Sequence, residues 1–130
     1  MDSEGRKCTV AVVDDDAGFR RALGRLIQSA GFEVDAYERG AEFLAAVVEH
    51  PTDCVVLDLQ MPGMDGLEVQ ARMNRSGIRI PIVVVTGYDT PDSEARFLER
   101  GASAYLRKPV DQEVLLQAIR GAVAARGSRR

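Results

Sequence analysis

Short apolar runs alternate along the chain with longer stretches in which apolar residues recur at helical spacing. Three runs are apolar almost throughout: TVAVV at 9–13, CVVL at 54–57 and IPIVVV at 80–85. Such runs are typical of strands that are buried on both faces of a sheet. FEVDAY at 32–37 alternates apolar and polar residues, which indicates a less buried edge strand, and SAYL at 103–106 predicts a last short strand.

A helix is predicted after each strand. The helical stretches are residues 19–30, closed by Gly31; residues 43–48, ended by Pro51; residues 65–74; residues 93–100, closed by Gly101; and residues 114–123. A strand–helix unit repeated five times predicts an α/β protein with a parallel sheet covered on both faces. We expect a flavodoxin-like three-layer sandwich, with five helices and a five-stranded parallel sheet in the order 2-1-3-4-5. This order puts the alternating strand at an edge, and a Rossmann order is less favoured because no GxGxxG follows the first strand.

The composition fits one globular domain and argues against binding to nucleic acid or to a membrane. A chain of 130 residues with a net charge of −3 can bury a core, and it has no overall basic field for nucleic acid. We therefore expect no direct nucleic-acid binding by this domain. The N-terminus is polar and no apolar run is long enough for a membrane span, so we expect a cytoplasmic protein with no membrane association. The predicted limits are an N-terminal tail at 1–8, the domain at 9–125, and a basic tail or the start of a linker at 126–130.

Polar residues follow every strand that is predicted to be buried. Because the carboxyl ends of parallel strands meet at one rim, near the point where strand order reverses, we expect these side chains to gather there. They are Asp14, Asp15 and Asp16 after the first strand, Asp58 after the third, Thr86 after the fourth, and Lys108 with Pro109 after the fifth. One acid of the first group is expected to cap the following helix. A cap does not account for all three, because adjacent carboxylates repel each other.

Carboxylates that meet at one rim need a cation. Oxygen ligands without histidine or cysteine favour Mg²⁺, or Mn²⁺, over zinc. Lys108 would add a mobile positive charge and Thr86 a hydroxyl donor. This combination suits a phosphoryl group in transfer, where positioning and charge neutralisation carry most of the catalysis, and an acid could itself be the acceptor.

With these residues the sequence resembles the receiver domain of response regulators in two-component signalling. The resemblance covers about residues 9–123 and depends on VVDDD at 12–16, VVLDLQMPGMDG at 55–66, VVVTG at 83–87 and YLRKP at 105–109. It implies that Asp58 is the phosphoacceptor. It also implies a Mg²⁺ site whose ligands are Asp14, Asp15, Asp58 and the Gln60 backbone carbonyl. Thr86 and Lys108 would contact the phosphoryl group, and Thr86 with Tyr105 would form the switch pair. The bond before Pro109 is expected to be cis.

The resemblance further implies a signalling switch that catalyses only its own phosphotransfer and dephosphorylation. A sensor histidine kinase or a histidine phosphotransfer protein would supply the phosphoryl group. The face made by the last helices and strand would then act on a downstream effector domain or protein, or form a homodimer promoted by phosphorylation. Two alternatives stay open: a pseudo-receiver that only binds partners, and a small Mg²⁺-dependent phosphohydrolase. The hydrolases of the haloacid-dehalogenase kind carry a second acid two residues after the nucleophile, whereas this chain has Gln60.

Other residues near the ends of the strands have two interpretations. Phe19 belongs either to the core or to the helix face that members of the family offer to the kinase. Tyr88 and Asp89 come just after Thr86 and Gly87, so they are expected near the rim. Cys8 and Cys54 begin neighbouring strands, and we expect structural thiols there and not a redox switch.

Overall fold

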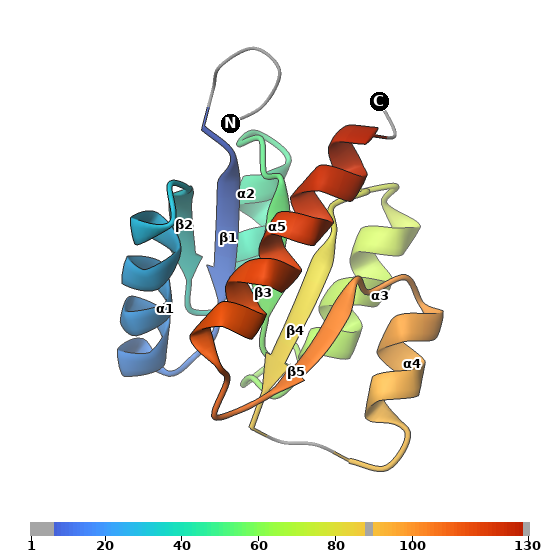
Figure 1. Cartoon of the computed structure of the whole chain (residues 1–130). Coiled ribbons are helices and arrows are strands. Elements are labelled where there is room, and N and C mark those ends of the chain that lie inside the picture. The colour runs from blue at the N-terminus through green and yellow to red at the C-terminus, as the bar shows by residue number, and fades with distance from the viewer. Residues whose placement is uncertain (1–6, 88–89, 129–130) are drawn as a thin grey trace.

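The computed structural model of the chain, which describes residues 7–87 and 90–128, contains a five-stranded parallel sheet in the order β2-β1-β3-β4-β5 (Figure 1). The strands are β1 (Thr9–Val13), β2 (Glu33–Tyr37), β3 (Cys54–Leu57), β4 (Ile82–Thr86) and β5 (Ala104–Arg107). The helices are α1 (Ala17–Ser29), α2 (Gly40–Val47), α3 (Gly66–Arg75), α4 (Ser93–Glu99) and α5 (Gln112–Ser128). The predicted fold class, strand order and helix number are confirmed.

The sheet separates two apolar cores because successive residues of a strand point to opposite faces. Ala11 and Val13 of β1 pack towards α2, α3 and α4, in one cluster with Phe43 and Phe97. Val10 and Val12 pack towards α1 and α5, in a second cluster whose buried members include Leu23, Ile27, Leu115 and Ile119. A fully buried side chain of this size stabilises the fold by about 1.5–3 kcal/mol relative to an exposed one. Both faces of β1, β3 and β4 are therefore covered, which explains their uninterrupted apolar runs.

The register of the central strands decides which residues reach the carboxyl rim. Val10 pairs with Cys54 and Val13 with Leu57, so Asp14 and Asp58 follow the two strands at the same level. The Asp58 N–H donates to the carbonyl of Val13 at 3.0 Å, which continues the ladder one residue beyond the strands. The backbone pairing of β1 and β3 therefore sets the positions of both acids, independently of the contacts of their side chains.

Several element boundaries differ from the prediction. β4 begins at Ile82 and not at residue 80, because Pro81 has no N–H to donate to a neighbouring strand, although its carbonyl accepts from Val55 at 2.9 Å. α2 begins at Gly40, ahead of the apolar residues that revealed it, and its N-terminal residues pack closely on α3. A Cβ on Gly40 would lie 2.4 Å from Val69 Cγ2, so this helix contact requires glycine.

At both ends, residues outside the predicted limits 9–125 still contact the rest of the fold. Cys8, expected in the tail, is only 4% exposed. α5 continues past residue 125 to Ser128, and Arg126 Nη1 donates to the carbonyl of Thr52 at 2.5 Å and to Asp53 Oδ1 at 3.2 Å. These contacts tie the last turn of α5 to the loop before β3. In the described part of the chain, no helix has the length and apolar character that a membrane crossing requires.

The cysteines are both free and buried. Burial raises the pKa of the Cys54 thiol to about 12, with a smaller contribution from the neighbouring Asp53 carboxylate. A thiol that stays protonated and enclosed is chemically inert, which agrees with the structural role expected for this residue. Tyr88 and Asp89 lie outside the described residues.

Candidate phosphoacceptor site

Three carboxylates meet at the carboxyl rim between β1 and β3. One ligand oxygen from each of Asp14, Asp15 and Asp58 lies within 4.8 Å of the others. Asp14 and Asp58 are 3% and 7% exposed, while Asp15 is exposed. The predicted acidic cluster is therefore present, with two carboxylates at the bottom and one open to solvent. A set of hard oxygen donors at this spacing fits Mg²⁺ better than a soft metal.

Asp58 is held in a surrounding that disfavours its charge. Burial raises the pKa of its carboxyl group to about 6, and the negative charge of Asp14 contributes in the same direction. The Lys108 ammonium and the backbone N–H of Gln60 partly offset this rise in pKa. Burial and the neighbouring carboxylate therefore outweigh the stabilising effect of Lys108 and the Gln60 N–H on the charged form of Asp58.

Lys108 reaches the rim from the opposite end of the chain. Its Nζ lies 2.9 Å from Asp14 Oδ2, and its side chain is only 21% exposed. The Lys108 backbone N–H donates to the carbonyl of Thr86 at 2.8 Å, and the bond from Lys108 to Pro109 is cis, as the resemblance implies. In this structure the ammonium pairs with Asp14, and the predicted contact with a phosphoryl group stays a prediction.

The third acid of the DDD run has a different task. Asp16 Oδ1 accepts from the Phe19 N–H at 3.0 Å and caps α1, which confirms the expected helix cap. This bond also lowers the pKa of the exposed Asp16 carboxyl. In turn, the Asp16 N–H donates to Asp14 Oδ1 at 2.9 Å, and Arg20 Nη1 donates to the Asp14 carbonyl at 2.7 Å. The start of α1 thereby orients Asp14.

The loop after β3 depends on a glycine that the chemistry of the motif does not single out. Gly66, the first residue of α3, donates its N–H to the carbonyl of Leu59 at 2.8 Å. A Cβ at this position would lie 2.5 Å from the backbone oxygen of Asp58 and 3.0 Å from Leu59 Cα. Any side chain would therefore displace the backbone that carries the acceptor. Asp65 caps α3 by accepting from the Glu68 N–H at 2.9 Å. The Gln60 side chain is exposed, and the binding of a cation by its backbone carbonyl stays a prediction.

The predicted switch residues lie on the neighbouring strands β4 and β5, two residues out of register with each other. Thr86 is 1% exposed and pairs in register with Arg107, while Tyr105 pairs with Val84 and is 6% exposed. The Tyr105 ring packs on Phe97 of α4 with 6.1 Å between the centroids, and the Arg107 guanidinium lies 5.3 Å from the Tyr105 ring centroid. Arg107 Nη2 also bonds Glu94 Oε1 at 2.8 Å, so β5 is joined to α4 by both apolar and ionic contacts.

Sequence reasoning did not find the parts of the site that act through other residues. Three such parts contact rim residues: Arg20, Gly66 and the ring of Phe19. None of them directly follows a predicted strand, which is the signal that identified the acids, Thr86 and Lys108. The Phe19 ring packs partly in the core and also faces Lys108 Nζ, 4.0 Å from the ring centroid. Phe19 lies in the first turn of α1, three residues after the capping acid Asp16, and this closeness to the DDD run is a signal that could have indicated a role at the site.

Comparison with known proteins agrees with this geometry. Residues 10–120 match the family model described as "Response regulator receiver domain". Nodulation protein W of Bradyrhizobium diazoefficiens is 38% identical over 113 residues, which are 87% of this chain and 50% of that protein. The transcriptional regulatory protein TdiR of Thauera aromatica is 34% identical over 120 residues, which are 92% of this chain and 53% of that protein.

A solved structure shows the same relationship. The structure of the response regulator StyR is 38% identical and superposes with a TM-score of 0.88, covering 96% of this chain and 63% of that one. The chain spans about half the length of the curated relatives it matches. Receiver domains are signalling domains, and the fold, the acidic rim and the sequence matches agree on one assignment. The chain belongs to the response regulator receiver domain family.

Proposed function

We propose that residues 9–125 form a phosphorylation-dependent switch in which Asp58 accepts a phosphoryl group from a sensor histidine kinase or a histidine phosphotransfer protein. The observation that carries this proposal is the meeting of Asp14, Asp15 and Asp58 within 4.8 Å, with Lys108 Nζ 2.9 Å from Asp14. An acid, two neighbouring carboxylates for a cation and a mobile ammonium are the groups that phosphoryl transfer to a carboxylate requires.

In the transfer step, one oxygen of Asp58 attacks the phosphorus of the phosphohistidine. The new P–O bond forms as the P–N bond breaks, and the departing histidine nitrogen takes a proton from water. Lys108 releases Asp14 and pairs with the added phosphoryl oxygens, and the Thr86 hydroxyl donates to one of them. In the reset step, water attacks the phosphorus, the P–O bond to Asp58 breaks, and inorganic phosphate is released together with the restored carboxylate.

The acidic residues and one backbone carbonyl would hold the cation. Asp15 and Asp58 would bind it directly, Asp14 largely through water, and Gln60 through its carbonyl. Bound Mg²⁺, or Mn²⁺ in its place, supplies positive charge that neutralises the developing charge on the phosphoryl oxygens. The fit is supported by the high pKa of Asp58, because the burial and like charge that raise it are relieved by a cation.

The added charge of about −1.5 to −2 would shift the domain between two forms. Thr86 and Tyr105 form the switch, and the face made by α4, β5 and α5 transmits the change. The partner is an output domain or protein, and the names of relatives such as TdiR support a role in transcription. A homodimer promoted by phosphorylation is a further form of output. We place the protein in the cytoplasm, which family membership and the two free thiols support.

Intact-mass measurement with acetyl phosphate tests the proposal. We expect the protein to gain the mass of one phosphoryl group in the presence of Mg²⁺, and to gain none with a chelator or in Asp58→Asn. Asp65→Asn is the matched control, because it removes an exposed acid from the same loop and asparagine still caps α3. No gain in the wild type, under conditions that label a known receiver, would favour a pseudo-receiver. Rapid turnover of a soluble phosphate ester would favour the phosphohydrolase.

A further inference from the structure

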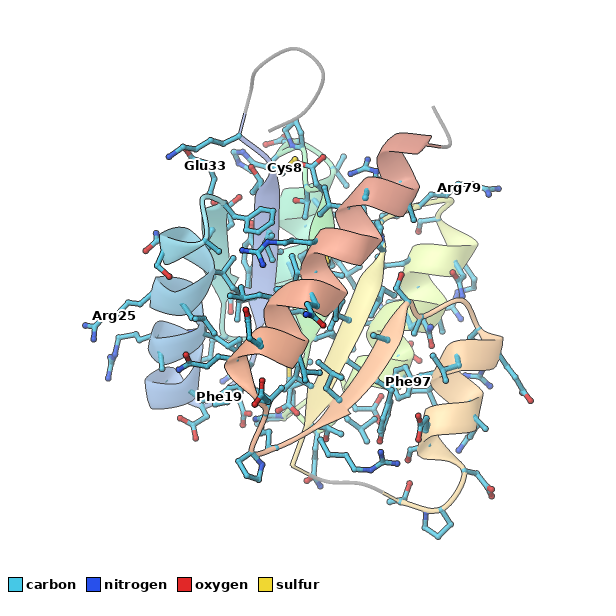
Figure 2. The ribbon with its side chains drawn as sticks, in the orientation of Figure 1. Cys8, Phe19, Arg25, Glu33, Arg79 and Phe97 are labelled. Atoms are coloured by element: carbon cyan, nitrogen blue, oxygen red, sulfur yellow. The ribbon has the colours of Figure 1, made fainter. Side chains whose placement is uncertain are left out.

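The ammonium of Lys108 lies between a carboxylate and an aromatic ring. Figure 2 shows Phe19 at the foot of α1, at the end of the sheet where the strands finish. Lys108 Nζ is 4.0 Å from the Phe19 ring centroid and 2.9 Å from Asp14 Oδ2. A cation within about 6 Å of a ring face is attracted by the ring quadrupole, and this contact is close within that range.

The ring itself is firmly held. The Phe19 N–H donates to Asp16 Oδ1, and the Asp16 N–H donates to Asp14 Oδ1. The Phe19 side chain is half-buried and packs against the apolar cluster beneath α1 and α5. Its position relative to Asp14 is therefore set by the helix cap and by the core, so the ring offers Lys108 a fixed surface.

The two partners of the ammonium differ in what else they must bind. Asp14 belongs to the acidic cluster, so its charge is shared with the cation that the site is proposed to hold. The ring is neutral and offers no ligand oxygen, so a cation does not compete with Lys108 for it. A lysine side chain has many rotamers, and a fixed apolar face keeps the ammonium at the rim when its ion pair with Asp14 is given up.

We propose that Phe19 is a positioning residue for phosphoryl transfer, whose ring keeps the Lys108 ammonium at the rim where it meets the phosphoryl group on Asp58. The proposal rests on the proposed function of the site. It differs from both earlier interpretations of Phe19, because core packing and a kinase contact do not act through Lys108. The chemistry at stake is the face of an aromatic ring and not merely an apolar side chain.

The rate of phosphorylation by acetyl phosphate and Mg²⁺ separates these roles, because this small donor has no docking face. We expect Phe19→Leu to lower the rate about three- to tenfold, which corresponds to the loss of one partly buried cation–π contact. Phe19→Tyr keeps the ring and should stay within about twofold of the wild type. Phe32→Leu is the matched control: Phe32 packs against the same cluster but precedes β2, at the opposite end of the sheet.

A double-mutant cycle with Lys108→Met tests whether Phe19 acts through the lysine. Met keeps an apolar stem without the charge, so in this background Phe19→Leu should change the rate by less than about twofold. An equal loss in both backgrounds would overturn the proposal and indicate plain packing.

NMR of the metal-free protein supplies a readout that does not depend on phosphorylation. The Lys108 Cε protons should be shifted upfield by the ring current in the wild type and Phe19→Tyr, and this shift should disappear in Phe19→Leu. A Lys108 signal that is the same in all three proteins would overturn the proposal. If the wild type accepts no phosphate, the proposed function fails, and the NMR result still decides the contact.

Discussion

Replacing Asp58 by asparagine should stabilise the protein against unfolding at neutral pH when no divalent cation is present. The carboxyl group is 7% exposed, and burial together with the Asp14 charge raises its pKa from 3.8 to about 6. An acid whose pKa is higher in the folded state than in the unfolded state does not lower the free energy of unfolding at a pH below its unfolded-state pKa, because it is then protonated in both states. This destabilisation grows as the pH rises from about 4 to 6 and is complete above that range.

The size of the effect follows from this shift in pKa. A shift of about two pKa units corresponds to about 3 kcal/mol, and solvent screening at the open side of the rim lowers the expected gain to about 1–2 kcal/mol. With a urea slope of about 2 kcal/mol/M, the middle of the range for small proteins, the midpoint of unfolding should rise by roughly 0.5–1 M at about pH 7.5. Near pH 4 most Asp58 is protonated, so the two proteins should differ little there.

Urea unfolding followed by circular dichroism at several pH values measures this difference. Asp65→Asn is the control, because it changes an exposed acid of the same loop that lies outside the acidic cluster. Excess Mg²⁺ should raise the stability of the wild type more than that of Asp58→Asn, since a ligand stabilises the state that binds it. A variant less stable than the wild type near pH 7.5, or a gain of equal size near pH 4, would refute the conclusion that the charged form of Asp58 destabilises the folded protein.

Three further predictions concern the loop after β3, the last turn of α5 and the switch. Gly66→Ala should lower the free energy of unfolding by about 1–3 kcal/mol, because its Cβ would lie 2.5 Å from a backbone oxygen, while Gly121→Ala, with nothing within 4 Å, should raise it by up to about 1 kcal/mol in thermal or urea unfolding. Arg126→Ala should increase hydrogen exchange in the last turn of α5 and cost about 1 kcal/mol, since two hydrogen bonds to the loop before β3 are lost. Thr86→Ala should still accept phosphate but show a smaller change in the Tyr105 ring signals by NMR; an undiminished change would contradict the switch.

The sequence was sufficient for the fold because burial leaves a local pattern. β1 and β3 have the predicted limits, Thr9–Val13 and Cys54–Leu57, since strands covered on both faces are apolar at every position. The start of α2 at Gly40 was missed because this part of the helix contacts α3 through a glycine and adds no apolar residue to the pattern. A contact made through a glycine adds no apolar side chain, so it leaves no periodic hydrophobic pattern in the sequence.

In the site, too, features with a local sequence pattern could be predicted, and features that depend on tertiary contacts could not. The acids, Thr86 and Lys108 could be named because each directly follows a recognisable strand. The partner of Lys108 could not be named, because Asp14 lies 94 residues away in the sequence. The pairing depends on the conformations of the loops that follow β1 and β5. The half-buried position of Phe19 against both the core and an ammonium is likewise a product of tertiary packing.

Chemical trapping of the phosphorylated residue tests the central claim most directly. Borohydride reduces an aspartyl phosphate to homoserine, so the protein is phosphorylated with acetyl phosphate and Mg²⁺, reduced, digested and sequenced by mass spectrometry. The account predicts homoserine at position 58 alone, and none when Mg²⁺ is chelated. Homoserine at position 14, 15 or 16 in place of 58, or the same yield at 58 without Mg²⁺, would contradict it.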